Sequence, residues 1–182
     1  LLVLILPMGM SEVILNKLMV DIQASQQAFW GYEADKMNRM YVRQYWKRVL
    51  LISGITLLSA IAIYVLTRYV TTHFPSNLGR ALITDPITKS VFFWSLIAYS
   101  FIAVALMNAV IMFSLSQPKL AIQSIWTSFL LDIVVGFLSS RWWGYEYAVI
   151  GLVAGSLVFV VVSTMNVLRI FRKLDYYLYV AS

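Results

Sequence analysis

The sequence predicts an all-α fold, a polytopic membrane helix bundle, and two observations support this prediction. Of the 182 residues, 61% are hydrophobic and only 12% are charged, whereas roughly a quarter of the residues of an average soluble domain are charged. After residue 48 the chain is dominated by four apolar runs, each long enough to cross the hydrocarbon core as a helix of about 20 residues. Backbone polar groups cannot remain unpaired in lipid, so helices are the elements that suit these runs.

The chain begins in the middle of an apolar stretch. Residues 1–10 have neither a basic leading segment nor a small-residue cleavage site, so they do not have the pattern of a signal peptide. We expect them to be the end of a truncated membrane helix. The chain is then expected to be the C-terminal part of a longer protein.

Residues 11–47 are more polar and are expected to form a cytoplasmic or interfacial amphipathic segment. In its second half Arg39, Arg43 and Lys47 recur every four residues, on a different helical face from the aromatic residues. Such a basic face suits anionic lipid headgroups, at about 1 kcal/mol for each charge near the surface. A solvated connector with ordinary basic flanks explains the pattern equally well.

Four transmembrane helices are expected between residues 48 and 171. They cover approximately residues 49–70, 91–114, 119–140 and 147–171. The loops after the second and third spans are short, so we expect consecutive helices to be antiparallel neighbours. Residues 172–182 are expected to form a cytoplasmic tail.

The orientation follows from the basic residues on alternate sides of the spans. Of the 14 lysines and arginines, ten belong to one side of the membrane: six precede the first span, Lys119 begins the third, and Arg169, Arg172 and Lys173 lie at or just after the end of the fourth. The excess predicts that this side is cytoplasmic and that both ends of the four-helix block face the cytoplasm. Aromatic residues gather at the opposite boundary, where amphipathic rings prefer to lie: Trp142, Trp143, Tyr145 and Tyr147.

The third span carries a polar stripe that contains an aspartate. Ser124, Ser128 and Asp132 recur every four residues, with Thr127 beside them. An aspartate at the centre of a span costs on the order of 3 kcal/mol by insertion scales, so a partner or a wet cavity must offset this cost. We interpret Asp132 as part of a translocation path that binds a cation, a proton or a cationic substrate group. The alternative is that Asp132 hydrogen-bonds to a neighbouring helix and only fixes packing.

Other spans contribute weaker candidates. Tyr99 and Asn108 in the second span are expected to line the same path, although polar residues often serve helix contacts in membranes. Gly151 and Gly155 in the fourth span have the GxxxG spacing that lets a second helix approach closely, so helix packing is their expected role.

Enzymatic and nucleic-acid functions find little support in the sequence. There is no HExxH motif, no Gly-rich phosphate loop before a helix, and one histidine in all. We therefore expect no catalysis, no metal site and no cofactor. The pI of about 9.6 reflects basic residues beside apolar runs, as in membrane flanks, so no nucleic-acid partner is expected.

Two short segments carry a family resemblance: Gly-Tyr-Glu-Tyr at 144–147 and Leu-Asp-Tyr-Tyr-Leu-Tyr at 174–179. With these segments, the stretch 142–182 resembles the end of the PelG family of exopolysaccharide exporters, in the multidrug/oligosaccharidyl-lipid/polysaccharide (MOP) flippase superfamily. The charged, aromatic segment before the four spans is also similar to that family in layout. The resemblance implies a twelve-helix transporter that works by alternating access, of which this chain supplies part of the C-terminal six-helix lobe.

For function, the resemblance implies export of a Pel-like exopolysaccharide across the bacterial inner membrane, in biofilm formation. The implied partners are the polysaccharide, the lipid bilayer and PelD, PelE and PelF-like synthesis proteins. Two alternatives of the same class remain open, a lipid-linked oligosaccharide flippase and a MATE-like antiporter. A non-transporting scaffold subunit that positions a cytoplasmic enzyme is an alternative of another class.

Overall fold

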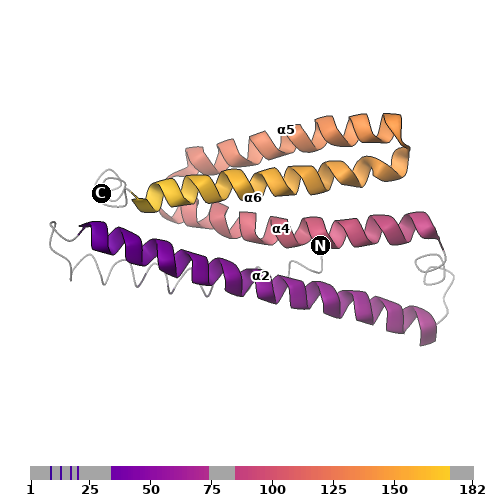
Figure 1. Ribbon diagram of the computed structural model, residues 1–182, viewed down its shortest axis with the longest axis horizontal. Helices are drawn as coiled ribbons and strands as arrows, with labels where there is room; N and C mark the ends of the chain where they lie inside the picture. The colour runs from indigo at the N-terminus through magenta and orange to yellow at the C-terminus, as the bar shows by residue number, and fades with distance from the viewer. Residues whose placement is uncertain are drawn as a thin grey trace.

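The computed structural model describes residues 34–73 and 85–172, together with Gly9, Val13, Lys17 and Val20. These residues contain no β-strand, and four helices are long and apolar enough to cross a membrane, which confirms the all-α class and fits a multi-pass membrane protein. The elements are α2 (Ala34–His73), α4 (Pro86–Ser114), α5 (Pro118–Trp142), the short 3₁₀ helix η2 (Tyr145–Ala148) and α6 (Val149–Arg172) (Figure 1).

The bounds of α4, α5 and α6 differ from the predicted spans by at most a few residues. Helix α2 differs more, because it begins at Ala34 and runs through the first span without a break. Residues 34–47, which were expected to belong to a separate segment, thus continue the first membrane helix on its N-terminal side. The expected truncated helix at 1–10, nearly all of residues 11–33 and the tail after Arg172 lie outside the described residues.

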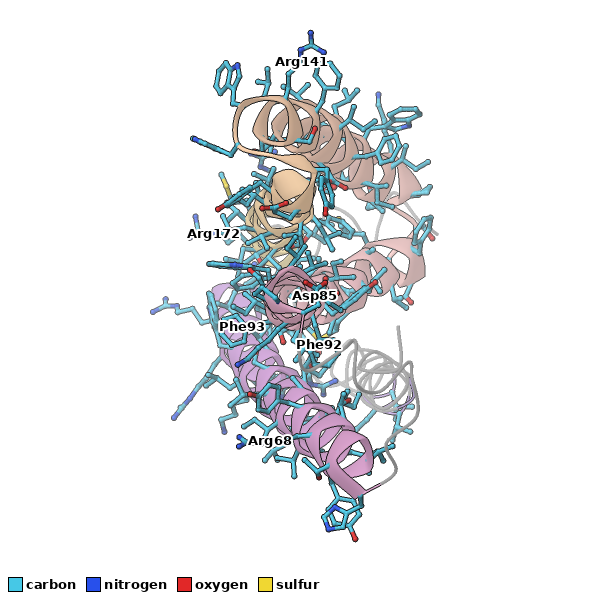
Figure 2. The ribbon with its side chains drawn as sticks, turned by 90° about the vertical axis from the view of Figure 1, so that its right-hand side faces the viewer. Arg68, Asp85, Phe92, Phe93, Arg141 and Arg172 are labelled. Atoms are coloured by element: carbon cyan, nitrogen blue, oxygen red, sulfur yellow. The ribbon has the colours of Figure 1, made fainter. Side chains whose placement is uncertain are left out.

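The helices form an open row in the order α2, α4, α6, α5 (Figures 1 and 2). Helix α6 lies between α4 and α5 and packs extensively against both, whereas α4 and α5 contact each other little. The prediction that consecutive spans are neighbours is therefore correct for α5 and α6 but wrong for α4 and α5 over most of their length. The small and polar faces of α5 and α6 fit each other, so α6 packs back onto α5 and fills the place beside α4.

The N-terminal half of α2 is held against the row by aromatic packing. Tyr41 and Tyr45 are buried, and both rings contact Phe171 near the end of α6, with ring centroids 6.4 and 5.8 Å apart. Ile52, which lies two helical turns after Tyr45 on the same face of α2, is also fully buried. The tyrosines that were expected to mark one face of an amphipathic surface segment are thus core residues.

The C-terminal half of α2, on the side predicted to be the outer one, diverges from α4 (Figure 1). Its apolar side chains are mostly exposed in the isolated chain, among them Leu58 at 67% and Leu66 at 61%. The outer face of α5 is likewise apolar and exposed, from Ile125 to Leu138. Such surfaces would be unstable in water but suit lipid tails or further helices.

Helix α4 begins at a capped aspartate. The carboxylate of Asp85 accepts hydrogen bonds from the backbone N–H groups of Ile87 (3.3 Å) and Thr88 (3.2 Å) and from the Thr88 hydroxyl. The hydroxyl bond is the main reason that the pKa of Asp85 lies below its ordinary value of 3.8; burial opposes this lowering, and the two backbone bonds add to it. Pro86, which lacks an N–H, occupies the first helical position, where no such donor is needed.

The cap predicts a local pH dependence. Because the folded-state pKa of Asp85 is lowered, its stabilisation of the first turn is complete above the ordinary pKa and is lost as the pH falls through the lower folded value. We expect the amides of Ile87 and Thr88 to lose protection against hydrogen exchange, relative to mid-helix amides of α4, below about pH 4. In the Asp85→Ala variant the same amides should exchange fast at every pH. Equal protection in the variant and the native chain would show that the cap contributes nothing.

Candidate functional site

The polar stripe of α5 lies mainly against α6. Ser124, Ser128 and Ser139 are buried, and Ser124 accepts a hydrogen bond of 3.0 Å from the side-chain amide of Asn166 on α6. The hydroxyl of Ser128 donates to the Ile125 carbonyl of its own helix. Because these groups have partners and are enclosed by α6, most of the stripe serves the contact between the two helices.

Two glycines of α6 let α5 approach closely. A Cβ atom built on Gly151 would lie 2.5 Å from the Cα of Gly136 and 2.6 Å from the carbonyl oxygen of Asp132, and one on Gly155 would lie 2.7 Å from the Cβ of Asp132. Real Cβ atoms do not come so near to other atoms, and the blocking atoms at Gly151 belong to the backbone. Both positions therefore require glycine for helix packing.

Asp132 lies in this contact, near the centre of α5, roughly 15 Å along the helix from Trp142 at its end. Its Cβ sits over Gly155, and its side chain is only partly buried. Within the part of the chain that the structure describes, its carboxylate has no hydrogen-bond or ion-pair partner. It thus differs from Ser124 and Ser128 of the same stripe, whose hydroxyls each donate to a backbone carbonyl of α5; Ser124 also accepts from Asn166.

A second polar cluster joins three helices on the other side of α6. The hydroxyl of Tyr45 donates to Oδ1 of Asn108 (2.9 Å), and the Asn108 amide donates to the hydroxyls of Ser163 and Thr164, both at 3.0 Å. Asn108 is fully buried. Both the oxygen and the nitrogen of the Asn108 side chain therefore have hydrogen-bond partners, as a buried amide in an apolar medium requires.

The residues predicted to share a path do not converge on one cavity. Asn108 lies on the α2 side of α6, whereas Asp132 lies on the α5 side. Thr127 is exposed and bonds to the Gln123 carbonyl of its own helix. Tyr99 is partly buried in α4 and, among the described residues, has no hydrogen bond to Asn108 or Asp132.

A cavity of about 390 Å³, which the sequence did not predict, lies at the end of the bundle opposite the basic residues of α2 and is called the outer cavity below. It lies between the first turns of α4, the helix η2 and the start of α6, and it combines two aromatic rings, of Trp94 and Tyr147, with the carboxyl group of Glu146 and the hydroxyl of Ser90. Aromatic rings beside a few polar groups are common in ligand pockets. The Gly-Tyr-Glu-Tyr turn was the available signal, but its partner residues stand more than 50 positions earlier in the sequence.

The end of the bundle formed by the start of α2 and the end of α6 carries several basic residues. Arg39, Arg43 and Lys47 are all exposed along α2. Arg39 and Arg172 border a polar cavity of about 390 Å³, where the side-chain amide of Asn38 donates to the Arg172 carbonyl at 3.2 Å. These cations lie at one end of the bundle, the end predicted to face the cytoplasm.

The described residues contain no group of three histidine, cysteine or acidic side chains close enough to hold a metal ion.

Comparison with known proteins finds no match among family models, curated proteins or solved structures. The resemblance to the PelG family therefore stays a prediction that depends on the residues quoted for it.

Proposed function

We propose that the chain forms part of a bacterial inner-membrane polysaccharide transporter of the MOP type, which exports a Pel-like exopolysaccharide by alternating access. The observation that carries the proposal is Asp132, a carboxyl group at the centre of a membrane-spanning helix with no partner among the described residues. Ionisable groups at such depth are rare and typically mark substrate or ion pathways. The family resemblance supplies the substrate class.

The surroundings of Asp132 are consistent with a place at the edge of a path. Gly155 of α6 has no side chain to cover the aspartate, and the aspartate remains partly exposed in the open row of helices. The cost of the carboxyl group, about 3 kcal/mol or more, is offset when water or a cationic group of the substrate reaches it. Within this proposal, Asp132 binds a cationic sugar unit or carries a proton as the transporter changes state.

The outer cavity extends the same proposal to the exit of the path. Trp94 and Tyr147 offer ring faces, and Glu146 offers a charged acceptor, which together suit a sugar ring that carries hydroxyl or amino groups. The cavity lies at the outer boundary, on the side opposite the basic residues of α2. PelD, PelE and PelF-like proteins would meet the transporter on the cytoplasmic side, and no catalytic role is assigned to the chain.

Replacing Asp132 tests the proposal. In cells that make the polymer, Asp132→Ala and Asp132→Asn variants of the intact protein are expected to lower export about tenfold or more, because a hydrogen bond to a charged group contributes about 1.5–3 kcal/mol and 1.4 kcal/mol corresponds to a factor of ten. The measurement is the secreted polymer per unit of membrane-inserted protein.

Thr127→Ala provides the matched control, since Thr127 lies on the same helix, is exposed and bonds only within α5. Its export should equal that of the native protein. Normal export by an abundant Asp132→Ala variant would contradict the proposal and favour a non-transporting scaffold. Loss of export of a lipid-linked oligosaccharide or a small cation, in place of the polymer, would favour the flippase or the antiporter.

A further inference from the structure

The divergence of α2 from α4 leaves a lateral cleft in the outer half of the row. The cleft has a volume of about 380 Å³, and its walls are almost entirely apolar. Its main lining residues are Leu57, Ile61 and Tyr64 on α2 and Phe93, Leu96 and Ile97 on α4. A cavity of this size and composition is in the range of ligand pockets.

Two cations stand at the outer mouth of the cleft. Arg68 follows Tyr64 by one helical turn on α2, and Lys89 precedes Phe93 by one turn on α4. Because residues four apart share a helix face, both cations lie on the faces that line the cleft. The two helices are antiparallel, so both cations lie at the same end of the bundle. Figure 2 looks toward this end, and Arg68 and Phe93 are labelled there.

The charge at this mouth is positive. Lys89 and Arg68 are exposed. Two described carboxylates lie by the first turns of α4. That of Asp85, one turn before Lys89, is engaged by the N–H groups and the Thr88 hydroxyl of the first turn, and that of Glu146 borders a different cavity, with Ser90 and Trp94. An anionic group that approached the mouth would therefore meet two cations and a carboxylate that is already bonded.

The depth of the cleft matches one leaflet. From Leu57 to Arg68 the α2 axis advances about 16 Å, and half of the hydrocarbon core of a bilayer is about 15 Å thick. An acyl chain that enters the cleft from the lipid would thus reach the level of Leu57 when its headgroup is level with Arg68.

We propose that this cleft binds a phospholipid of the outer leaflet with an anionic headgroup. One acyl chain lies between α2 and α4, and the phosphate lies between Lys89 and Arg68. The lipid fills the space where α2 leaves the row and thereby holds the outer half of α2 against α4. This proposal does not depend on transport by the chain.

Lipid retention by the purified chain tests the proposal. Phosphatidylglycerol is expected to stay bound in native mass spectra and to raise the thermal stability more than phosphatidylcholine with the same acyl chains. Each of Arg68→Gln and Lys89→Gln should weaken phosphatidylglycerol binding about fivefold, as expected for one basic residue near an anionic lipid. Ala60→Phe, which fills the cleft, should weaken the binding of both lipids.

Arg141→Gln is the matched control, because Arg141 is an exposed cation at the outer end of α5, away from the cleft. It should leave retention unchanged. Equal retention of both lipids, or full phosphatidylglycerol binding by the Arg68→Gln/Lys89→Gln variant, would overturn the proposal. Equal protection by soluble glycerol phosphate, which has no acyl chain, would overturn the assignment of the cleft.

Discussion

Replacing Gly151 by alanine is expected to destabilise the bundle by about 1–3 kcal/mol, the usual cost of an overpacked core, and Gly151→Leu by more. The added Cβ would come within 2.6 Å of three backbone atoms of α5, the Cα and N of Gly136 and the carbonyl oxygen of Asp132. Backbone atoms inside a helix cannot rotate away as a flexible side chain can, so α5 and α6 must move apart. The measurement is thermal or denaturant unfolding of the purified chain in a mild detergent.

Gly54→Ala is the matched control for this prediction. Gly54 also lies inside a membrane-spanning helix, α2, but a Cβ built there has no neighbour within 4 Å. This variant should be as stable as the native chain or more stable by up to about 1 kcal/mol, because glycine inside a helix costs about that much relative to alanine. If Gly151→Ala unfolds like Gly54→Ala and the native chain, α5 and α6 do not pack through their glycines.

The four spans could be predicted because an apolar run longer than about 18 residues leaves few alternatives to a membrane helix. The start of α2 could not be predicted in the same way. Its first turns carry Arg39 and Arg43, which are typical of a surface segment, while the contact that extends the helix, between Tyr45 and Phe171, joins the two ends of the described chain. Sequence periodicity shows that a face exists but does not show which distant residue covers it.

The same limit applies to the candidate site. The repeat of Ser124, Ser128 and Asp132 correctly indicated one special face of α5, yet only the fold shows that α6 covers most of it. Asn108 was expected on the path because it is polar, but its three partners on α2 and α6 make it a connector of helices. The outer cavity needed residues from three elements to be brought together, and no single segment contained enough of its polar and aromatic groups to reveal it.

The central claim is that hydrated space borders the carboxyl group of Asp132. The chain has no cysteine, so a cysteine placed in it is the only thiol of this part of the protein, and the protein without the added cysteine gives the background. A thiol reacts as the thiolate, which forms in water and not among lipid tails. Two reference variants give the lower and upper limits of the labelling rate. Val134→Cys lies on the exposed apolar face of α5 and should be labelled slowly, and Arg141→Cys lies at the end of α5 and should be labelled fast.

The most direct measurement is labelling of an Asp132→Cys variant of the intact protein, in membranes, with a charged, water-soluble thiol reagent. We predict that Asp132→Cys is labelled in at least one transport state, at a rate nearer to that of Arg141→Cys than to that of Val134→Cys. Absence of labelling at Asp132→Cys in every state, with Arg141→Cys labelled normally, would contradict the account.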